Sequence, residues 1–424
     1  MSNCFTMFAV LCLTVSLAAC ASLPSVSQVA PTTVTSTATS VSTPPPTATP
    51  IPTTPAPTVT LAPTTPAPTA TSAQTAPSAA ATASGDRQPP LDIAAQVDAL
   101  MNKYVAAHLF SGSVHIAHNG TVLISKGYGL ADQEQKIPNT PQIRFSIASL
   151  TKQFTAMAVL QLQQQGKLQV QDSVCRYVPD CPTAWQGMTI HQLLTHTAGV
   201  PDLSDADFQA LQPTPNSFEQ LIAKTKSKPL DFQPGSKWSY SNAGYMILAL
   251  IIEGVSGTSY PAFLQKSIFA PLHMNDTGYV QPSDKVALGY DNSFSKAAPF
   301  DPVLLYGAAG LFSTTEDLYR WSQALSTTQL VSQKLLDQMF TPFASALPVG
   351  SAEEPGGAWY GYGWGITKRL NRRMAIHEGI IRGYHSLVER YLDDKVSIIL
   401  LSNQNNTELD DIGKALAPII FNEK

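Results

Sequence analysis

The stretch Ser149-Leu150-Thr151-Lys152 decides how the rest of this chain is interpreted. The run Ile143-Arg144-Phe145-Ser146-Ile147 ahead of it has an extended character, and the residues after it are helix formers that are apolar through their middle. This pattern predicts a buried helix that begins at Ser149 and ends near Gly166. Because residues three apart share a helix face, we expect Ser149 and Lys152 to lie side by side.

A serine and a lysine in this arrangement have a chemical use. A serine hydroxyl becomes an effective nucleophile when a neighbouring base accepts its proton. Burial in an apolar helix disfavours the ammonium form of Lys152, so its pKa falls and it can act as that base. The helix N-terminus adds backbone N–H groups for a developing oxyanion. Four-residue patterns also recur by chance, and a helix cap followed by a solvated lysine is the alternative interpretation.

The first twenty residues predict a signal peptide. They are apolar over a length too short to span a membrane, and Leu17-Ala18-Ala19-Cys20 resembles the lipobox of bacterial lipoproteins, whose cysteine is acylated. No Lys or Arg precedes the apolar run, and an ordinary signal peptide cleaved nearby is the alternative. Both interpretations predict export. The first also predicts a cell-envelope lipoprotein, anchored through Cys20 at the outer face of a bacterial membrane.

Residues 21–90 are expected to form a disordered linker. They consist of Thr, Pro, Ala and Ser with almost no charge, a composition that cannot bury a core and that is shared by O-glycosylated stalks. At about 3.1 Å per residue in polyproline II, such a segment reaches on the order of 200 Å. Residues 91–424 are then the folded domain.

Composition limits the partners and cofactors. The net charge of -4 argues against nucleic acid. Cys175 and Cys181 are an even pair in the folded region of an exported chain, which favours a disulfide, with two buried thiols as the alternative. Two cysteines do not make a zinc site, and we expect no metal and no organic cofactor.

The order of predicted elements indicates an α+β fold. We expect an antiparallel sheet built from both chain ends and flanked by helices, together with a mostly helical lobe. The predicted elements are a helix at 91–108, a hairpin at 113–125 with Asn119-Gly120 as its turn, helical segments over 172–302, strands at 363–367, 386–391 and 396–401, and a helix at 409–420.

Two further motifs carry chemistry. Tyr240-Ser241-Asn242 lies on a loop just ahead of an apolar helix, where functional side chains are often presented. A tyrosine beside a lysine ammonium is expected to have a lowered pKa and to shuttle protons, and Asn242 can bond both a substrate amide and the lysine. Taken alone, this motif is equally typical of exposed loop residues.

His377-Glu378-Gly379 lies between strand candidates. The glycine is expected to let a substrate backbone approach a strand edge. His377, with an ordinary pKa near 6.5, is expected to be charged at mildly acidic pH and to attract a substrate carboxylate. The motif is not a zinc-protease signature, because position 381 is isoleucine. Exposed loop or strand residues are the alternative interpretation.

The order Ser-x-x-Lys, Tyr-x-Asn, His-x-Gly resembles the class C β-lactamase-like, penicillin-recognising serine hydrolases. This group includes class C β-lactamases, D-alanyl-D-alanine carboxypeptidases, D-aminopeptidases and β-lactamase-like esterases. The resemblance spans roughly 97–401 and extends to the segments Leu193–Gly199, Tyr240–Tyr245 and Gly310–Thr314. It implies a β-lactamase/transpeptidase-like fold.

The resemblance also implies roles for individual residues. They are Ser149 as acylated nucleophile, Lys152 as its base, Tyr240 as proton shuttle, Asn242, His377 and Gly379 as substrate-binding residues, the N–H groups of Ser149 and Ile380 as the oxyanion hole, and His196 as a structural residue. Two positions depart from the pattern of the group. Isoleucine at 380, where the group usually has a small residue, is expected to narrow the site. Histidine at 377, where class C β-lactamases have lysine, weakens the case for binding a β-lactam carboxylate.

The sequence thus predicts an exported serine hydrolase that works through an acyl-enzyme on amide or ester bonds, in cell-wall-type D-peptides or small esters. β-Lactam hydrolysis and a catalytically silent penicillin-binding-type protein are the alternatives, because one fold hosts several chemistries. The expected partners are a small-molecule or peptide substrate and, through the lipid anchor, a membrane. The expected oligomeric state is a monomer.

Overall fold

The structure is a computed structural model, and it describes residues 90–204, 206–207, 217–279, 285–346 and 358–423. The predictions for the signal peptide and its lipobox, Cys20 included, and for the linker up to residue 89 lie outside the described residues. The fold below is that of the domain that follows them.

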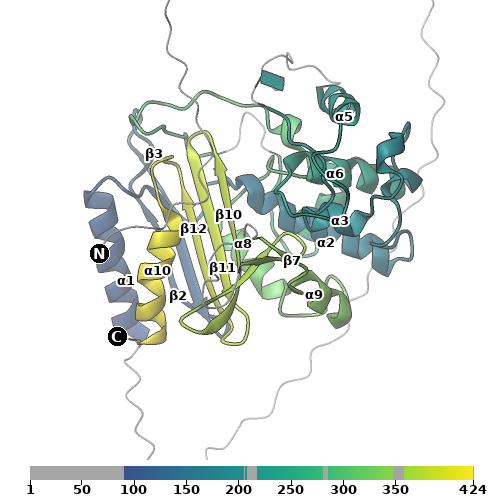
Figure 1. Cartoon of the computed structure of the whole chain (residues 1–424). Helices are drawn as coiled ribbons and strands as arrows, with labels where there is room; N and C mark the ends of the chain where they lie inside the picture. The colour runs from purple at the N-terminus through teal and green to yellow at the C-terminus, as the bar shows by residue number, and fades with distance from the viewer. Residues whose placement is uncertain (1–89, 205, 208–216, 280–284, 347–357, 424) are drawn as a thin grey trace, which may run out of the picture. The chain divides into compact units, whose positions relative to one another are not determined.

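An eight-stranded antiparallel sheet forms the centre of the domain (Figure 1). Its strand order is β2-β1-β12-β11-β10-β9-β8-β7. The strands are β1 (Gly112–His118), β2 (Thr121–Tyr128), β7 (Ala344–Ser345), β8 (Trp359–Tyr360), β9 (Gly365–Arg369), β10 (Arg372–Ile381), β11 (Tyr384–Tyr391) and β12 (Val396–Ser402). Pairing of β1 with β12 joins the N-terminal hairpin to the C-terminal strands. The prediction of a sheet built from both chain ends is therefore confirmed.

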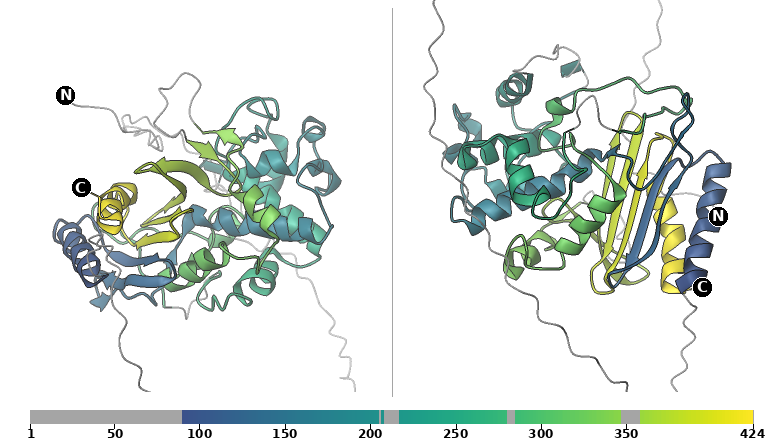
Figure 2. Two further views of the ribbon diagram at one scale, coloured as in Figure 1. Left: turned by 90° about the horizontal axis from the view of Figure 1, so that it is seen from below. Right: turned by 180° about the vertical axis from the view of Figure 1, so that it is seen from behind.

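Two helices cover one face of this sheet, as the views in Figure 2 show. They are α1 (Pro90–Ala106) and α10 (Leu409–Phe421), which come from opposite ends of the domain and lie against each other. Their apolar stripes meet Leu387 and Leu400 of the sheet, which are fully buried. Removing this apolar surface from water holds the first and last helices of the domain in place.

The other face of the sheet packs against the helical lobe. Its helices are α2 (Thr151–Gln164), α3 (Ile190–Leu194), α5 (Ser217–Ser227), α6 (Asn242–Ser256), α7 (Tyr260–Leu264), α8 (Thr315–Ala324) and α9 (Gln333–Met339). Helix α2 is buried from Thr151 to Leu162 and packs on α6. The predicted buried helix is confirmed, but it begins at Thr151 and not at Ser149, which lies in a preceding 3₁₀ turn. It ends where expected, because Gly166 takes a left-handed φ of 69° just beyond it.

Short elements complete the domain. They are the 3₁₀ turns η1 (Ala148–Leu150), η2 (Val174–Arg176), η3 (Thr183–Trp185) and η5 (Pro302–Leu305), the π-helical segment η4 (Gln265–Phe269), and the strand pairs β3 (Leu130–Asp132) with β4 (Ile137–Pro138) and β5 (Phe145–Ser146) with β6 (Phe312–Ser313). Only Phe145 and Ser146 of the run predicted to be extended before Ser149 form a strand.

Strand β10 was missed by the sequence analysis. His377, Glu378 and Gly379 lie inside this strand, so placing them between strands was wrong. The strand opens with two arginines and contains an acidic residue and a glycine, which obscures the alternation that marks a half-buried strand. Its pairing with β11 along Met374–Ile381 supplies the stabilisation that local propensity lacks.

Two further features bear on the predictions. Cys175 and Cys181 are joined by a disulfide with a Cα–Cα distance of 5.3 Å. Among the described residues, no single helix is long and apolar enough to cross a bilayer, and α6 with Tyr260–Phe269 meets those criteria only as a pair bent by 73°.

Candidate active site

Ser149 lies in the tight turn η1 that leads into α2. The residue before it, Ala148, has a left-handed φ of 43°, a conformation that non-glycine residues rarely adopt. The turn is fixed from outside, because Ile147 donates its N–H to Leu311 O at 3.0 Å and Leu311 donates to Thr151 Oγ1 at 3.2 Å. A strained turn that its surroundings over-determine is typical of functional sites.

Strand β10 packs directly against this turn at Gly379. A Cβ added to Gly379 would lie 2.3 Å from Ile147 O and 2.8 Å from Ser149 N, so no other residue fits without moving backbone. The Ser386 hydroxyl of β11 lies 2.8 Å from Ile147 O and 3.2 Å from Gly379 O, within hydrogen-bonding distance of both. The glycine thus admits the Ser149 turn of the protein itself, and the approach of a substrate backbone to this strand edge stays a prediction.

Lys152 is completely buried beneath Ser149. Its Nζ lies 3.2 Å from Ser149 Oγ, 2.7 Å from Asn242 Oδ1 and 3.0 Å from Ala308 O. Burial lowers the pKa of Lys152 to about 7, and the charge of Asp202 opposes that shift. The predicted fall of this pKa agrees with the structure, and a large share of the lysine is a neutral amine at neutral pH.

The hydrogen-bond partners of Lys152 fix the orientation of its neutral amine. A neutral amine has two N–H donors and one lone pair. Asn242 Oδ1 and the carbonyl of Ala308 can only accept, so they take the two N–H groups. The hydroxyl of Ser149 is the remaining partner and is able to donate a proton. The lone pair therefore points at the proton that must leave Ser149.

The Ala308 carbonyl reaches the lysine because of the preceding glycine. Gly307 has a φ of 78°, and a Cβ at this position would lie 2.3 Å from Tyr245 O of helix α6. The close approach to α6 brings Ala308 O to 3.0 Å from Lys152. The sequence analysis missed this contact, since backbone carbonyls leave no residue signature.

Tyr240 lies over both members of the pair. Its phenol is hydrogen-bonded to the Ser149 side chain, and its ring centroid is 4.7 Å from Lys152 Nζ. Burial raises the pKa of Tyr240 above its ordinary value, and the charge of Asp202 adds to the rise. The expectation of a lowered pKa was wrong, because desolvation outweighs the lowering effect of the hydrogen bond with Ser149. The Tyr240 phenol is therefore protonated in the resting site and can donate its proton.

Asn242 is the first residue of α6 and both ends of its amide are engaged. Oδ1 accepts from Lys152, and Nδ2 donates to Asp202 Oδ2 at 3.0 Å. Because the Asp202 carboxylate can only accept, it takes the amide N–H, and Oδ1 is thereby turned toward Lys152. The sequence analysis missed Asp202, which lies 40 residues before the helix that it contacts.

His377 is buried in the floor of the site. Its Nδ1 donates to Glu378 O at 2.6 Å, so Nε2 is the acceptor that receives the Tyr360 hydroxyl at 2.9 Å. Burial, together with the charge of Lys152, lowers the pKa of His377 to about 3. The expectation that His377 is charged at mildly acidic pH was wrong: it stays neutral, and both of its ring nitrogens are occupied within the protein.

His196 supports the loop that carries Tyr240. Its Nδ1 accepts the N–H of Ser241 at 3.1 Å, its carbonyl accepts from Ser239 at 3.0 Å, and its ring centroid lies 4.3 Å from that of Tyr240. Burial holds its pKa well below the ordinary value. These contacts fit the structural role expected for it.

The outer edge of β10 is open next to Ser149. Strand β9 pairs only with Arg372–Ile376, so Gly379 and Ile380 have β11 as their one strand neighbour among the described residues. Side chains alternate along a strand, and Ile380 therefore faces away from the Ser149 turn that Gly379 touches. With 53% of its surface exposed, Ile380 does not narrow the site, and that expectation is corrected.

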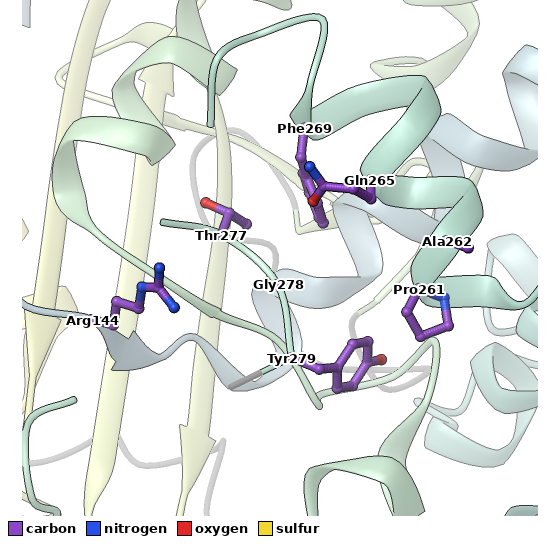
Figure 3. Close-up of a pocket in the computed structure, with 8 residues that line it drawn as sticks. All are labelled: Arg144, Pro261, Ala262, Gln265, Phe269, Thr277, Gly278 and Tyr279. Atoms are coloured by element: carbon purple, nitrogen blue, oxygen red, sulfur yellow. The ribbon is translucent and has the colours of Figure 1, made fainter. Parts of the chain in front are cut away.

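The cavity of about 350 Å³ in Figure 3 is separate from these residues. It is lined by Arg144, Gln265, Thr277 and Tyr279, among others, and neither Ser149 nor any of its neighbours in the candidate site lines it. Arg144 is paired with Asp276 at 2.9 Å. In the part of the chain that the structure describes, no three His, Cys, Asp or Glu side chains gather closely enough to hold a metal ion.

Comparison with known proteins places this fold and site. Residues 97–418 match the family described as Beta-lactamase. A Bacillus subtilis (strain 168) protein named as a penicillin-binding protein, PbpX, is 32% identical over 330 residues, which cover 76% of this chain and 78% of that protein. The chain therefore belongs to the beta-lactamase family of serine hydrolases, and the resemblance inferred from the motifs is confirmed.

Solved structures agree with this assignment. The octameric penicillin-binding protein homologue from Pyrococcus abyssi superimposes with a TM-score of 0.70 at 28% identity, over 78% of each chain. The D-amino acid amidase from Ochrobactrum anthropi SV3 gives a TM-score of 0.68 at 24% identity, over 78% of this chain and 99% of that one. The second likeness is one of fold.

The geometry predicts a pH dependence controlled by Lys152 and independent of His377. We expect kcat/KM to rise with pH through the Lys152 pKa of about 7, because the neutral amine is the active form. Carboxylate-bearing and neutral esters should give the same profile, since His377 has a pKa of about 3 and carries no charge in this range.

The measurement is kcat/KM against pH for both ester types in the wild type and in His377→Gln. The variant should keep the rising limb at the same pH, whatever its effect on the rate. A fall with rising pH that appears only for the carboxylate-bearing ester, and that disappears in His377→Gln, would contradict the neutral histidine.

Proposed function

We propose that this protein hydrolyses amide or ester bonds through an acyl-enzyme formed on Ser149. The observation that carries the proposal is the buried Lys152 amine, whose two other partners can only accept hydrogen bonds and thereby direct its lone pair at Ser149 Oγ. Membership of the beta-lactamase family supports the same chemistry.

Acylation begins when Ser149 Oγ attacks the substrate carbonyl carbon and Lys152 Nζ takes the hydroxyl proton. The carbonyl oxygen becomes an oxyanion, for which the N–H groups of Ser149 and Ile380 are the proposed donors. Collapse of the intermediate breaks the bond to the leaving nitrogen or oxygen. That atom receives the Tyr240 proton, and the Lys152 ammonium re-protonates Tyr240, so all protons balance.

Deacylation follows the same route with water as the nucleophile. Water gives a proton to the neutral Lys152 amine as its oxygen attacks the ester carbonyl. When the acid product leaves, Ser149 Oγ takes the Tyr240 proton, and the Lys152 ammonium re-protonates Tyr240. The high pKa of Tyr240 suits this role, because a phenol that stays protonated at rest can donate when the leaving group needs a proton.

For the substrate we favour cell-wall-type D-peptides or small esters. A neutral His377 whose ring nitrogens both bond within the protein offers no charge to a substrate carboxylate, which argues against a site built for β-lactam acids and, among D-peptides, against those with a carboxylate next to the scissile bond. The names of the Bacillus and Pyrococcus relatives refer to penicillin binding and keep β-lactam hydrolysis as the second candidate. The intact Ser149 and Lys152 contact argues against a silent binding protein.

Replacing the nucleophile tests the proposal. Ser149→Ala should abolish covalent labelling by a fluorescent phosphonate, because the reacting oxygen is gone, while the thermal melt stays close to that of the wild type. Tyr240→Phe should still label but lose about 10²–10⁴-fold in kcat, the usual worth of a positioned acid–base group. Gel fluorescence and steady-state kinetics on a nitrophenyl ester measure both effects.

A matched control is Ser256→Ala, which removes a half-buried hydroxyl that bonds Thr258 at the C-terminal end of α6. It should label and turn over like the wild type. Labelling that survives in Ser149→Ala would show that another residue is the nucleophile and would overturn the proposal.

We also propose that the mature protein is a lipoprotein, tethered outside a bacterial membrane by Cys20 and the Pro/Thr-rich segment after it. The Leu17-Ala18-Ala19-Cys20 sequence supports this. Cys20→Ala should move the protein from the membrane fraction to the soluble fraction of fractionated cells, as followed by immunoblot. Membrane association that is unchanged in the variant would speak against a lipid anchor at this position.

A further inference from the structure

The carboxylate of Asp202 lies directly behind the catalytic constellation. Asp202 Oδ2 accepts from Asn242 Nδ2 at 3.0 Å, and Oδ1 accepts the backbone N–H of Ala243 at 2.9 Å. The Ser241 hydroxyl lies 3.4 Å from the same Oδ1. One carboxylate thus contacts three consecutive residues, the middle one of which bonds Lys152.

These contacts also anchor the start of α6. Ser241 is the N-cap of this helix and accepts the N–H of Gly244 at 3.0 Å, while Asp202 takes the N–H of Ala243. Two of the N–H groups that a helix leaves without partners at its N-terminus are therefore satisfied by two different side chains. The Asn242 side chain leaves the first turn of a helix that Asp202 holds in register.

We propose that Asp202 is a positioning residue for the hydrolytic reaction: it fixes the Asn242 amide toward Lys152 and sets the charge state of the lysine through that amide. The proposal rests on the proposed function of Ser149 and Lys152. It assigns a role to the residue that follows Gly199-Val200-Pro201, outside the three motifs.

The other titratable groups around Lys152 are neutral, so the effect of the Asp202 charge on the lysine pKa can be observed separately. Tyr240 and Tyr245 place their rings 4.7 Å and 5.6 Å from Lys152 Nζ, and burial keeps both phenols protonated by raising their pKa values. His196 and His377 feel the lysine charge and are neutral, because burial lowers their pKa values. Among the described residues, Asp202 is the charged group that acts on Lys152.

The sign of the effect follows from the chemistry. A nearby negative charge favours the ammonium form of Lys152, so its removal lowers the lysine pKa. The neutral amine is the active form, and the rising limb of kcat/KM therefore moves to lower pH when Asp202 loses its charge. Because the Asp202 side chain is exposed, solvent screens it, and the expected shift is on the order of half a pH unit.

The experiment compares three variants by kcat/KM against pH on p-nitrophenyl acetate. Asp202→Asn keeps one acceptor oxygen, for Asn242 or for Ala243, but loses the charge, so its limb should move to lower pH with a smaller loss of plateau kcat than in Asp202→Ala. Asp202→Glu keeps the charge and should hold the wild-type limb. Asp202→Ala should shift the limb and also lose at least about tenfold in kcat, because the charge-assisted hydrogen bonds to Asn242 and Ala243 are both lost.

Asp393→Asn is the matched control. It removes the same charge from an exposed aspartate in the turn between β11 and β12, where the residue pairs with Arg373. Its profile should coincide with that of the wild type. A limb that stays in place in Asp202→Asn, or that moves equally in Asp393→Asn, would overturn the proposal.

Salt provides a test on the unchanged protein in case Asp202→Asn does not fold. Raising the ionic strength to about 1 M shortens the Debye length to about 3 Å and screens the exposed carboxylate. The rising limb of the wild type should move to lower pH, in the direction expected for Asp202→Asn, and a limb that does not move with salt would contradict the proposal.

If the wild type neither labels nor hydrolyses, the proposed function itself fails and this inference falls with it. If the wild type labels and hydrolyses, but the pH of the rising limb is the same in the Asp202 variants, only the inference is wrong.

Discussion

The burial of one amine is the constraint on which the site depends. Lys152 is completely enclosed, and a charged ammonium in that position pays a desolvation penalty that brings its pKa down to about 7. The same enclosure forces every polar contact of the amine to come from the protein. Two carbonyl-type acceptors occupy its N–H groups, so its lone pair has one direction left, toward Ser149.

The rest of the fold supplies those contacts from distant parts of the chain. Helix α2 presents Lys152, helix α6 presents Asn242, and the 306–310 loop presents Ala308 O because Gly307 allows a close approach. Strand β10 presses Gly379 against the Ser149 turn, and the sheet that contains it is completed only when the two ends of the domain pair through β1 and β12. The site therefore requires the whole domain.

Separation along the sequence decided which contacts of the site could be predicted. Ser149 and Lys152 are three residues apart, so local periodicity places them together, and Tyr240 and Asn242 stand out by their motif. Asp202, Tyr360 and Ser386 reach the site across tens to hundreds of residues, and no spacing rule connects them to it. The glycine of the His-x-Gly motif was noticed, but the backbone atoms that it touches became visible only in the fold.

Two predictions of protonation state were wrong for the same reason. The pKa of Tyr240 was expected from the neighbouring lysine and that of His377 from the ordinary value of histidine, whereas burial dominates both. Desolvation depends on everything that packs around a group, and a short motif does not contain that information. Lys152 was predicted in the right direction because its apolar helix already signalled burial.

The most direct test of this account is an NMR titration of the Lys152 side-chain amine in the folded protein. Selective isotope labelling, with Lys152→Met to assign the signal, would follow the shifts of Cε and Nζ with pH. The account predicts a midpoint of about 7, far below the value of 10.5 for a free lysine. A midpoint near that of the surface lysines would mean that Lys152 is an ammonium at neutral pH and is not the base for Ser149.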